Sequence, residues 1–189
     1  MRRGSYNTSL LRAAIEVAPE DADVALWDGI GDLPIYNHDL EGADLVESVR
    51  RLRVDWAAAD AILFSTPEYN GSVPGGLKNA VDWASRPIDR AALRNQNVAV
   101  IGASTSQFGA LWAQLDLRKL LGIAGARVIG DELPVNRAPE KFDAGGNLID
   151  AELFALLRLT LERLVAESTP IVATASESSR PGSTRDGRP

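Results

Sequence analysis

The fold of this chain is decided by residues 66–83, which read TPEYNGSVPGGLKNAVDW. They follow the apolar run AILF at residues 61–64, which predicts a buried strand, and they continue into a helical pattern over residues 77–85. The first part of this stretch is therefore predicted to be a loop at the carboxyl end of a parallel strand. Open α/β sheets bind their ligands at that position.

The composition of this loop favours a ligand. Gly71, Gly75 and Gly76 allow positive φ angles and a close approach of the backbone to another molecule. Tyr69 offers a ring face, and Asn70 offers both a donor and an acceptor. A rigid loop of this kind suits a flat, polar-edged heteroaromatic ligand. The alternative interpretation is a glycine-rich turn followed by a helix cap, and the residue types alone leave both open.

Strands and helices alternate along the chain on both sides of this loop. Strands are predicted at residues 23–27, 61–65, 97–102 and 126–129, and helices at 10–18, 43–59, 74–85, 110–121 and from 150 onward. The strands are almost continuously apolar, as expected when both faces of a sheet are covered. The pattern predicts an α/β fold with a parallel sheet and helices on both faces.

Composition narrows the classes of function. The chain has 189 residues and a net charge of -6, which gives no support for a nucleic-acid partner or an anionic membrane surface. It has no cysteine, which excludes disulfides and thiolate chemistry and fits a cytoplasmic protein. No apolar run approaches the ~20 residues that span a membrane. We expect no metal site, and the single histidine, His38, lies in a polar loop.

Length and composition also predict the domain organisation. Residues 1–167 are expected to form one domain, since domains commonly span roughly 100–200 residues. Residues 168–189 are rich in Ser, Thr, Gly, Pro and Arg and contain no aromatic residue. We expect this tail to be disordered.

Two further polar loops are predicted at the same edge of the sheet. Residues 2–8 (RRGSYNT) lead directly into a helix, and a helix N-terminus with Ser, Asn, Thr and Arg nearby suits a phosphate, although an ordinary capped helix is the alternative. Residues 102–109 (GASTSQFG) follow another strand. A loop suited to a phosphate and two polar loops large enough to enclose a ring, all at one edge of the sheet, together predict a mononucleotide site.

These motifs resemble the NADPH-dependent FMN reductase family, a flavodoxin-like group that includes quinone, azo-dye and chromate reductases. The resemblance extends to about residue 165 and is most specific over residues 66–83. It implies a three-layer flavodoxin-like fold that binds FMN. It also implies that the phosphate is held by Arg2, Ser5 and Asn7, and that the isoalloxazine ring is lined by Pro67, Glu68, Tyr69, Asn70 and Gly71 and closed on its other side by the loop from Ser104 to Gly109.

The resemblance further implies an activity and an assembly. Hydride would pass from NADPH or NADH through FMN to a small-molecule acceptor, which could be a quinone, an azo compound or a flavin. The protein would be a homodimer or homotetramer. A flavodoxin-type electron carrier and an N-terminally truncated form unable to hold FMN are the alternatives.

The chain departs from the family pattern in two places. Thr105, Ser106 and Gln107 stand where relatives carry a Pro-Gly-Gly-like run, which leaves the choice of nicotinamide and acceptor open. The family also begins with a strand that ends in Gly-Ser-Leu, and Met1 stands where that Leu would be. The first strand, central in the order 2-1-3-4-5, is therefore expected to be missing from this chain.

We expect the native protein to start upstream of Met1. Loss of a central strand would leave buried amides and carbonyls unpaired, each at a cost of about 1–3 kcal/mol. The intact mass of the protein purified from its native source should exceed that of residues 1–189. A native mass that begins at Met1 would contradict this expectation.

Overall fold

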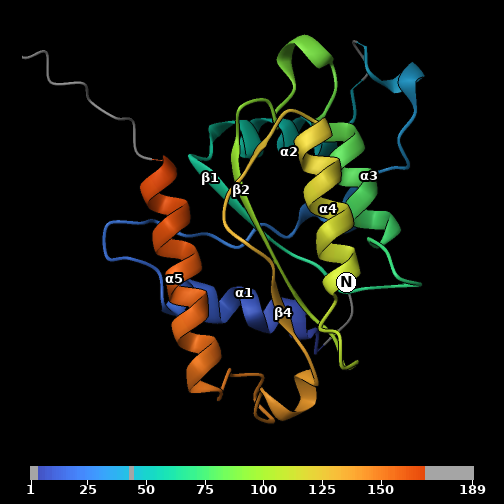
Figure 1. Ribbon diagram of the computed structural model, residues 1–189. Coiled ribbons are helices and arrows are strands. Elements are labelled where there is room, and N and C mark those ends of the chain that lie inside the picture. Colours follow the sequence, from blue (N-terminus) through green and yellow to red (C-terminus); the bar gives the residue numbers. More distant parts are fainter. Residues whose placement is uncertain (1–3, 43–44, 169–189) are drawn as a thin grey trace, which may run out of the picture.

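The strand at residues 97–103 organises the sheet. The computed structural model describes residues 4–42 and 45–168, and in it β2 (Asn97–Ala103) is buried along its whole length (Figure 1). It pairs in parallel with β1 (Ala61–Ser65), with Ala61 opposite Asn97 and Ser65 opposite Ile101. It also pairs in parallel with β3 (Arg127–Val128) near its start and with β4 (Leu133–Val135) near its end. The predicted parallel sheet is confirmed.

Over the residues that the structure describes, five α-helices cover the two faces of the sheet. They are α1 (Tyr6–Glu16), α2 (Glu47–Ala58), α3 (Gly75–Ala84), α4 (Leu111–Ile123) and α5 (Ala151–Ser168) (Figure 1). Short 3₁₀ helices η1 to η4 lie at Gly29–Asp32, His38–Leu40, Ile88–Arg90 and Ala138–Glu140. The long helices fall where the apolar periodicity predicts them.

The two faces of the sheet carry two separate cores. On one face, α2, α3 and α4 pack against Phe64 of β1 and against Val98 and Val100 of β2. On the other face, α1 and α5 pack against Ile101 and Ala103 of β2. Successive side chains of β2 thus serve opposite cores, as the pleat of a strand requires. The result is the three-layer flavodoxin-like arrangement that the sequence predicts.

The predicted strand at residues 23–27 does not form. This segment belongs to no ladder, and Leu26 is 40% exposed. Within the described ranges β1 pairs with β2 alone, so no neighbouring strand is present to receive the segment. Trp27 instead attaches it to α2, because its indole Nε1 donates to Asp55 at 2.8 Å and its ring meets Trp56 edge-on at 5.8 Å.

Other element bounds differ from the prediction in smaller ways. Helix α2 begins at Glu47 rather than at residue 43, and residues 43–44 lie outside the described residues. The strand predicted at 126–129 is reduced to β3, and β4 forms at Leu133–Val135, where no strand is predicted. Ser168 ends α5, and the rest of the predicted tail, 169–189, lies outside the described residues. The domain bounds 1–167 stay a prediction.

Truncating a side chain in the core between the sheet and helices α2, α3 and α4 should destabilise the protein. Leu117 of α4 is fully buried in the core formed with α2 and α3. Leu117→Ala is expected to lower the free energy of unfolding by about 3 kcal/mol, through lost burial and the cavity left behind. Leu159→Ala is the matched control, because Leu159 of α5 is 62% exposed. Equal losses in urea unfolding for the two variants would contradict the assigned core.

Candidate functional site

Asn7 brings the three predicted loops together. Its side chain is almost fully buried beneath the first turn of α1. Its Nδ2 donates to the carbonyl of Ala103 at 2.9 Å, and its Oδ1 accepts from the amide of Ala103 and from the hydroxyl of Ser65, both at 2.9 Å. The start of α1 is therefore fixed to the carboxyl ends of β1 and β2, where the other two loops begin (Figure 1).

The start of α1 has the form expected of an anion site. Ser5 caps the helix, and its hydroxyl oxygen accepts from the amide of Thr8 at 3.4 Å. The first amides of a helix have no partner within it and point along the positive end of its dipole. Arg2 lies outside the described residues. Asn7 reaches this site, but its side chain is committed to Ala103 and Ser65, so Ser5 and the helix amides are the main donors here.

The 66–72 loop is a tight hairpin. The amide of Tyr69 donates to the carbonyl of Ser72 and the amide of Ser72 donates back, both at 3.1 Å. The two residues between them, Asn70 and Gly71, have φ angles of 54° and 73°. Positive φ at both central positions defines a type I′ turn, which explains the Asn-Gly pair.

This hairpin presents unused donors to solvent. No residue in the described ranges accepts a hydrogen bond from the amides of Asn70 or Gly71. Tyr69 is 60% exposed, so its ring face is also accessible. Pro67 is half-buried, and its carbonyl accepts from the hydroxyl of the buried Thr66 at 2.8 Å, which fixes the base of the loop. The loop is thus rigid at its base and open at its tip.

The 104–109 loop is held by its own hydroxyl groups. Ser104 Oγ accepts from the amide of Ser106 at 3.1 Å, and Ser106 Oγ accepts from the amide of Phe108 at 3.3 Å. Gly109 is buried with φ of 60°, and a Cβ there would lie 2.7 Å from the carbonyl carbon of Pro134. Gly109 therefore lets the chain pass close to β4, while Ser104 lies half-buried at the edge of the sheet.

Glu68 lies at this site in a role that the sequence does not reveal. Its carboxylate Oε2 accepts from the amides of Trp112 and Ala113, at 3.1 and 3.3 Å, in the first turn of α4. The two partners are 44 and 45 residues away along the chain. No local pattern signals a cap that comes from so distant a residue.

Gln114 is a second polar residue that the sequence reasoning missed. Its side chain is fully buried, and its Nε2 donates to the carbonyl of Gly109 at 3.1 Å while its Oε1 accepts from the amide of Leu133 at 3.0 Å. It joins the third loop to β4. A glutamine on the apolar face of a predicted helix is a weak signal of such a role, since buried polar groups need partners.

The loop at residues 33–40 is anchored by α3. Asn79 accepts from the amide of Tyr36 at 2.8 Å and donates to the carbonyl of Pro34 at 2.9 Å. The indole of Trp83 also donates to Pro34, at 2.8 Å. The Tyr36 hydroxyl donates to Glu41, and that carboxylate raises the pKa of the phenol. These bonds explain the Asn and Trp at the end of the 66–83 stretch.

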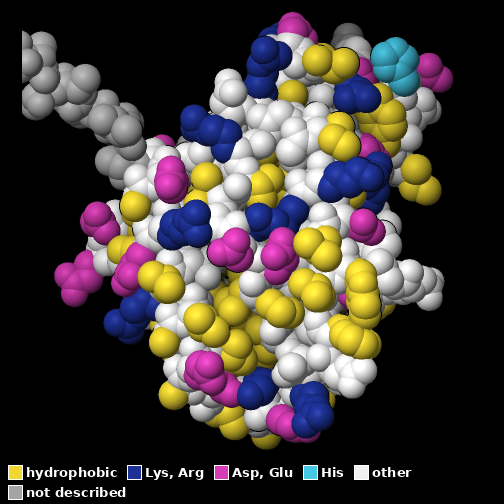
Figure 2. Space-filling view, in the orientation of Figure 1, with side chains coloured by type: hydrophobic (Ala, Val, Ile, Leu, Met, Phe, Trp, Pro, Cys, Tyr) yellow, Lys and Arg dark blue, Asp and Glu magenta, His cyan; other side chains and the backbone are white. Residues whose placement is uncertain are grey.

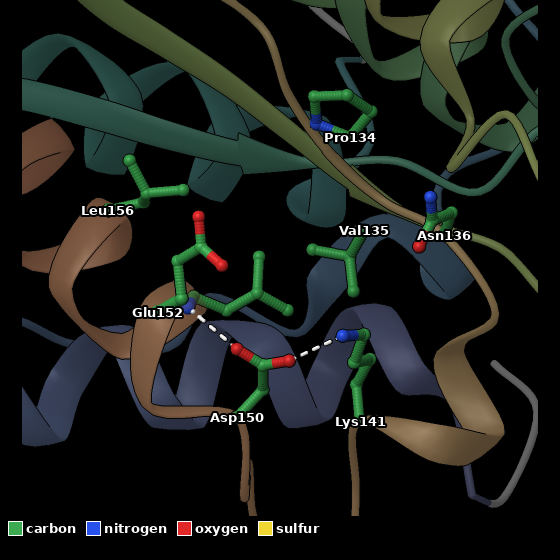
Figure 3. Close-up of a pocket in the computed structure, with 8 residues that line it drawn as sticks. Pro134, Val135, Asn136, Lys141, Asp150, Glu152 and Leu156 are labelled. Atoms are coloured by element: carbon green, nitrogen blue, oxygen red, sulfur yellow. Dashed lines mark hydrogen bonds and ion pairs between the residues drawn. The ribbon is translucent and has the colours of Figure 1, made fainter.

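A small cavity lies between β4 and the start of α5, and its lining includes Val135, whose carbonyl accepts from the amide of Ser104. It has a volume of about 170 Å³, and Lys141 and Asp150 form an ion pair in its wall (Figure 3). Lys141 lowers the pKa of the Asp150 carboxyl, and Asp150 raises the pKa of the Lys141 ammonium. Asp150 also accepts from the amide of Leu153 at 3.0 Å. Asp150 therefore caps the start of α5, and Lys141 pairs with the capping carboxylate.

Residues 4–42 and 45–168 contain no group of three or more side chains placed to hold a metal ion. Over the same residues, no helix is long and apolar enough to cross a membrane.

Comparisons with known proteins point to one family. The family model described as NADPH-dependent FMN reductase matches residues 1–140. An NAD(P)H-dependent FMN reductase of Pseudomonas aeruginosa is 39% identical over 165 residues, which cover 87% of this chain and 88% of the relative. A 2-hydroxy-1,4-benzoquinone reductase of a Burkholderia species is 34% identical over 167 residues, covering 88% and 90%.

A solved structure supports the same assignment. The flavoenzyme FerB, an NAD(P)H:(acceptor) oxidoreductase of Paracoccus denitrificans, superposes with a TM-score of 0.79 at 34% identity. The match covers 88% of this chain and 93% of FerB.

The parallel sheet, its two helical layers and the loops at its carboxyl edge define a flavodoxin-like protein. The chain belongs to the NADPH-dependent FMN reductase family. It is accordingly an oxidoreductase with FMN as its cofactor and NAD(P)H as its co-substrate. The family resemblance found in residues 66–83 is thereby confirmed.

Removing the Asn7 side chain should destabilise the protein strongly. Asn7→Ala leaves the buried amide and carbonyl of Ala103 without partners. We expect the free energy of unfolding to fall by roughly 2–4 kcal/mol. Asn147→Ala is the control, because exposed Asn147 bonds only to Asp143 in its own turn, and it should cost less than about 1 kcal/mol. Similar unfolding midpoints for both variants would disprove the role of Asn7.

Proposed function

We propose that this protein passes a hydride from NAD(P)H through FMN to a quinone. The observation that carries the proposal is the joining of three polar loops at one sheet edge by the buried Asn7 side chain. Relatives that share most of the chain bear the name quinone reductase. Azo compounds and free flavin are the other acceptors that the family resemblance allows.

The residues present fit FMN by the chemistry of their donors. The capped start of α1, with Ser5, offers the amides and hydroxyl that suit a phosphate. Arg2 would add a charged donor to this set. The tip of the hairpin offers amides of Asn70 and Gly71 that have no other partner among the described residues. Acceptor atoms at the edge of a heteroaromatic ring suit these two amide donors.

The cofactor and the protein divide the work. FMN, when bound, supplies the hydride chemistry. The chain's own groups bind and orient it: Ser5 and the first amides of α1 would hold the phosphate, and the loop from Pro67 to Gly71 would lie along the ring. Fixed amide dipoles at Asn70 and Gly71 would favour negative charge at the ring edge without reorganising. Ser104 and the loop up to Gly109 would close the opposite side.

The proposal includes a homodimer or homotetramer. Apolar side chains beside the hairpin are unusually exposed: Tyr69 is 60% exposed, Phe108 and Trp112 are 44%, and Leu115 is 47%. Phe108 and Trp112 also contact each other, with ring centroids 4.4 Å apart. Hydrophobic side chains are plentiful on the lower half of the face in Figure 2. Such patches commonly mark contacts between subunits.

A redox titration tests the proposed function. The purified protein supplied with FMN should retain a yellow flavin spectrum, which should bleach when NADPH is added without oxygen and return when 1,4-benzoquinone follows. A yellow protein that NADPH does not bleach would be an electron carrier of the flavodoxin type. A protein that takes up no FMN would support the alternative of a form unable to hold it.

A pair of glycine variants tests the hairpin itself. Gly71→Ala strains a residue at φ of 73°, so FMN binding should weaken by about tenfold or more. Gly122→Ala lies in α4 with open space around its added Cβ, and it should leave FMN binding unchanged. The dissociation constants follow from quenching of flavin fluorescence. Equal affinity in the two variants would exclude the hairpin from the flavin site.

A further inference from the structure

Helix α4 begins without a cap of its own. Its N-cap residue, Ala110, has φ of 62° and carries no side chain that could accept a hydrogen bond. The cap comes from Glu68, whose carboxylate accepts from the amides of Trp112 and Ala113. A carboxylate at the positive end of a helix of 13 residues is favoured both by these bonds and by the helix dipole.

This cap connects two loops that are distant in sequence. The 104–109 loop continues directly into α4, where the amide of Leu111 donates to the carbonyl of Phe108 at 3.1 Å. Any group that holds the first turn of α4 therefore also holds the end of that loop. Glu68 belongs to the 66–72 loop, so its carboxylate fixes the distance between the two loops.

A second, weaker bond supports the same connection. The hydroxyl of Ser72 donates to Asp116 at 2.8 Å, about one turn further along α4. This pair is exposed, so it should contribute little free energy in water. Glu68 is half-buried and bonds to two backbone amides, which makes it the principal link.

We propose that Glu68 is a positioning residue for the flavin ring, acting through its bonds to α4. Its carboxylate sets the separation of the 66–72 and 104–109 loops, and the ring would bind between two loops that already stand at this separation. The inference rests on the proposed function, because it concerns the same FMN site. This role explains why the loop contains an acidic residue beside its neutral donors. The negative charge of Glu68 faces the first turn of α4.

Three substitutions of Glu68 separate the effect of its side-chain length from the effect of its negative charge. Glu68→Gln keeps the length of the side chain and an accepting oxygen. Glu68→Asp keeps the charge but is one methylene too short to reach both amides. Glu68→Ala removes the acceptor. Asp150→Ala is the matched control, because Asp150 likewise accepts from the amide of Leu153 at the start of α5, and it has no bond to either loop.

Two readouts test the proposal, the FMN dissociation constant and amide hydrogen exchange in the FMN-free protein. Glu68→Ala and Glu68→Asp should weaken FMN binding by about tenfold, and Glu68→Gln by less than about threefold. Exchange should accelerate at Trp112 and Ala113 and also in the 66–72 loop. Asp150→Ala should accelerate exchange only in α5 and leave FMN affinity within about twofold of the unmodified protein.

The outcomes distinguish this inference from the proposed function. FMN affinity unchanged in Glu68→Ala and Glu68→Asp, or weakened equally in Asp150→Ala, would overturn the role of Glu68. If Glu68→Ala does not fold, the FMN dissociation constants of Glu68→Asp and Glu68→Gln decide the same question. If the unmodified protein binds no FMN, the proposed function fails and the inference about the ring fails with it. Unchanged amide hydrogen exchange at Trp112, Ala113 and the 66–72 loop in the FMN-free Glu68 variants would by itself disprove the link between the two loops.

Discussion

The buried side chain of Asn7 is the interaction on which the rest of the site depends. One amide group bonds to both backbone groups of Ala103 and to the hydroxyl of Ser65, so it joins α1 to the ends of two neighbouring strands. Without it, the start of α1 would have no polar anchor to the sheet among the bonds described, and the backbone of Ala103 would be buried without partners. The position of the start of α1 relative to the loops that follow β1 and β2 depends on these three bonds.

Sequence reasoning predicted most of the fold because the signals were local. The apolar runs that became β1 and β2, the periodic helices and the Asn-Gly turn each depend on residues close together in the chain. It failed for residues 23–27, whose composition suits a strand but which lack a partner in the described structure. The role of Glu68 could not be predicted and that of Gln114 was only weakly signalled, since Glu68 bonds to Trp112 and Gln114 to Leu133, which only the folded chain brings near.

Strand β1 is only partly buried. Among the described residues, β1 pairs only with β2, yet four of its five residues are half-buried rather than buried. Water can therefore satisfy part of the unpaired backbone, and the cost is smaller than for a fully buried edge. The 66–72 loop follows directly from β1, and it is held by the bond from the amide of Thr66 to Ile101 and by the bonds of Glu68 to α4.

We propose that three loops, joined through Asn7 and Glu68, form one FMN site at the carboxyl edge of the sheet. A crystal structure of the protein with FMN tests it most directly. We expect the phosphate at the start of α1 within hydrogen-bond distance of Ser5, the ring edge against the amides of Asn70 and Gly71, and Glu68 still bonded to Trp112 and Ala113. FMN bound elsewhere, or a Glu68 carboxylate turned away from α4 onto the ring, would contradict it.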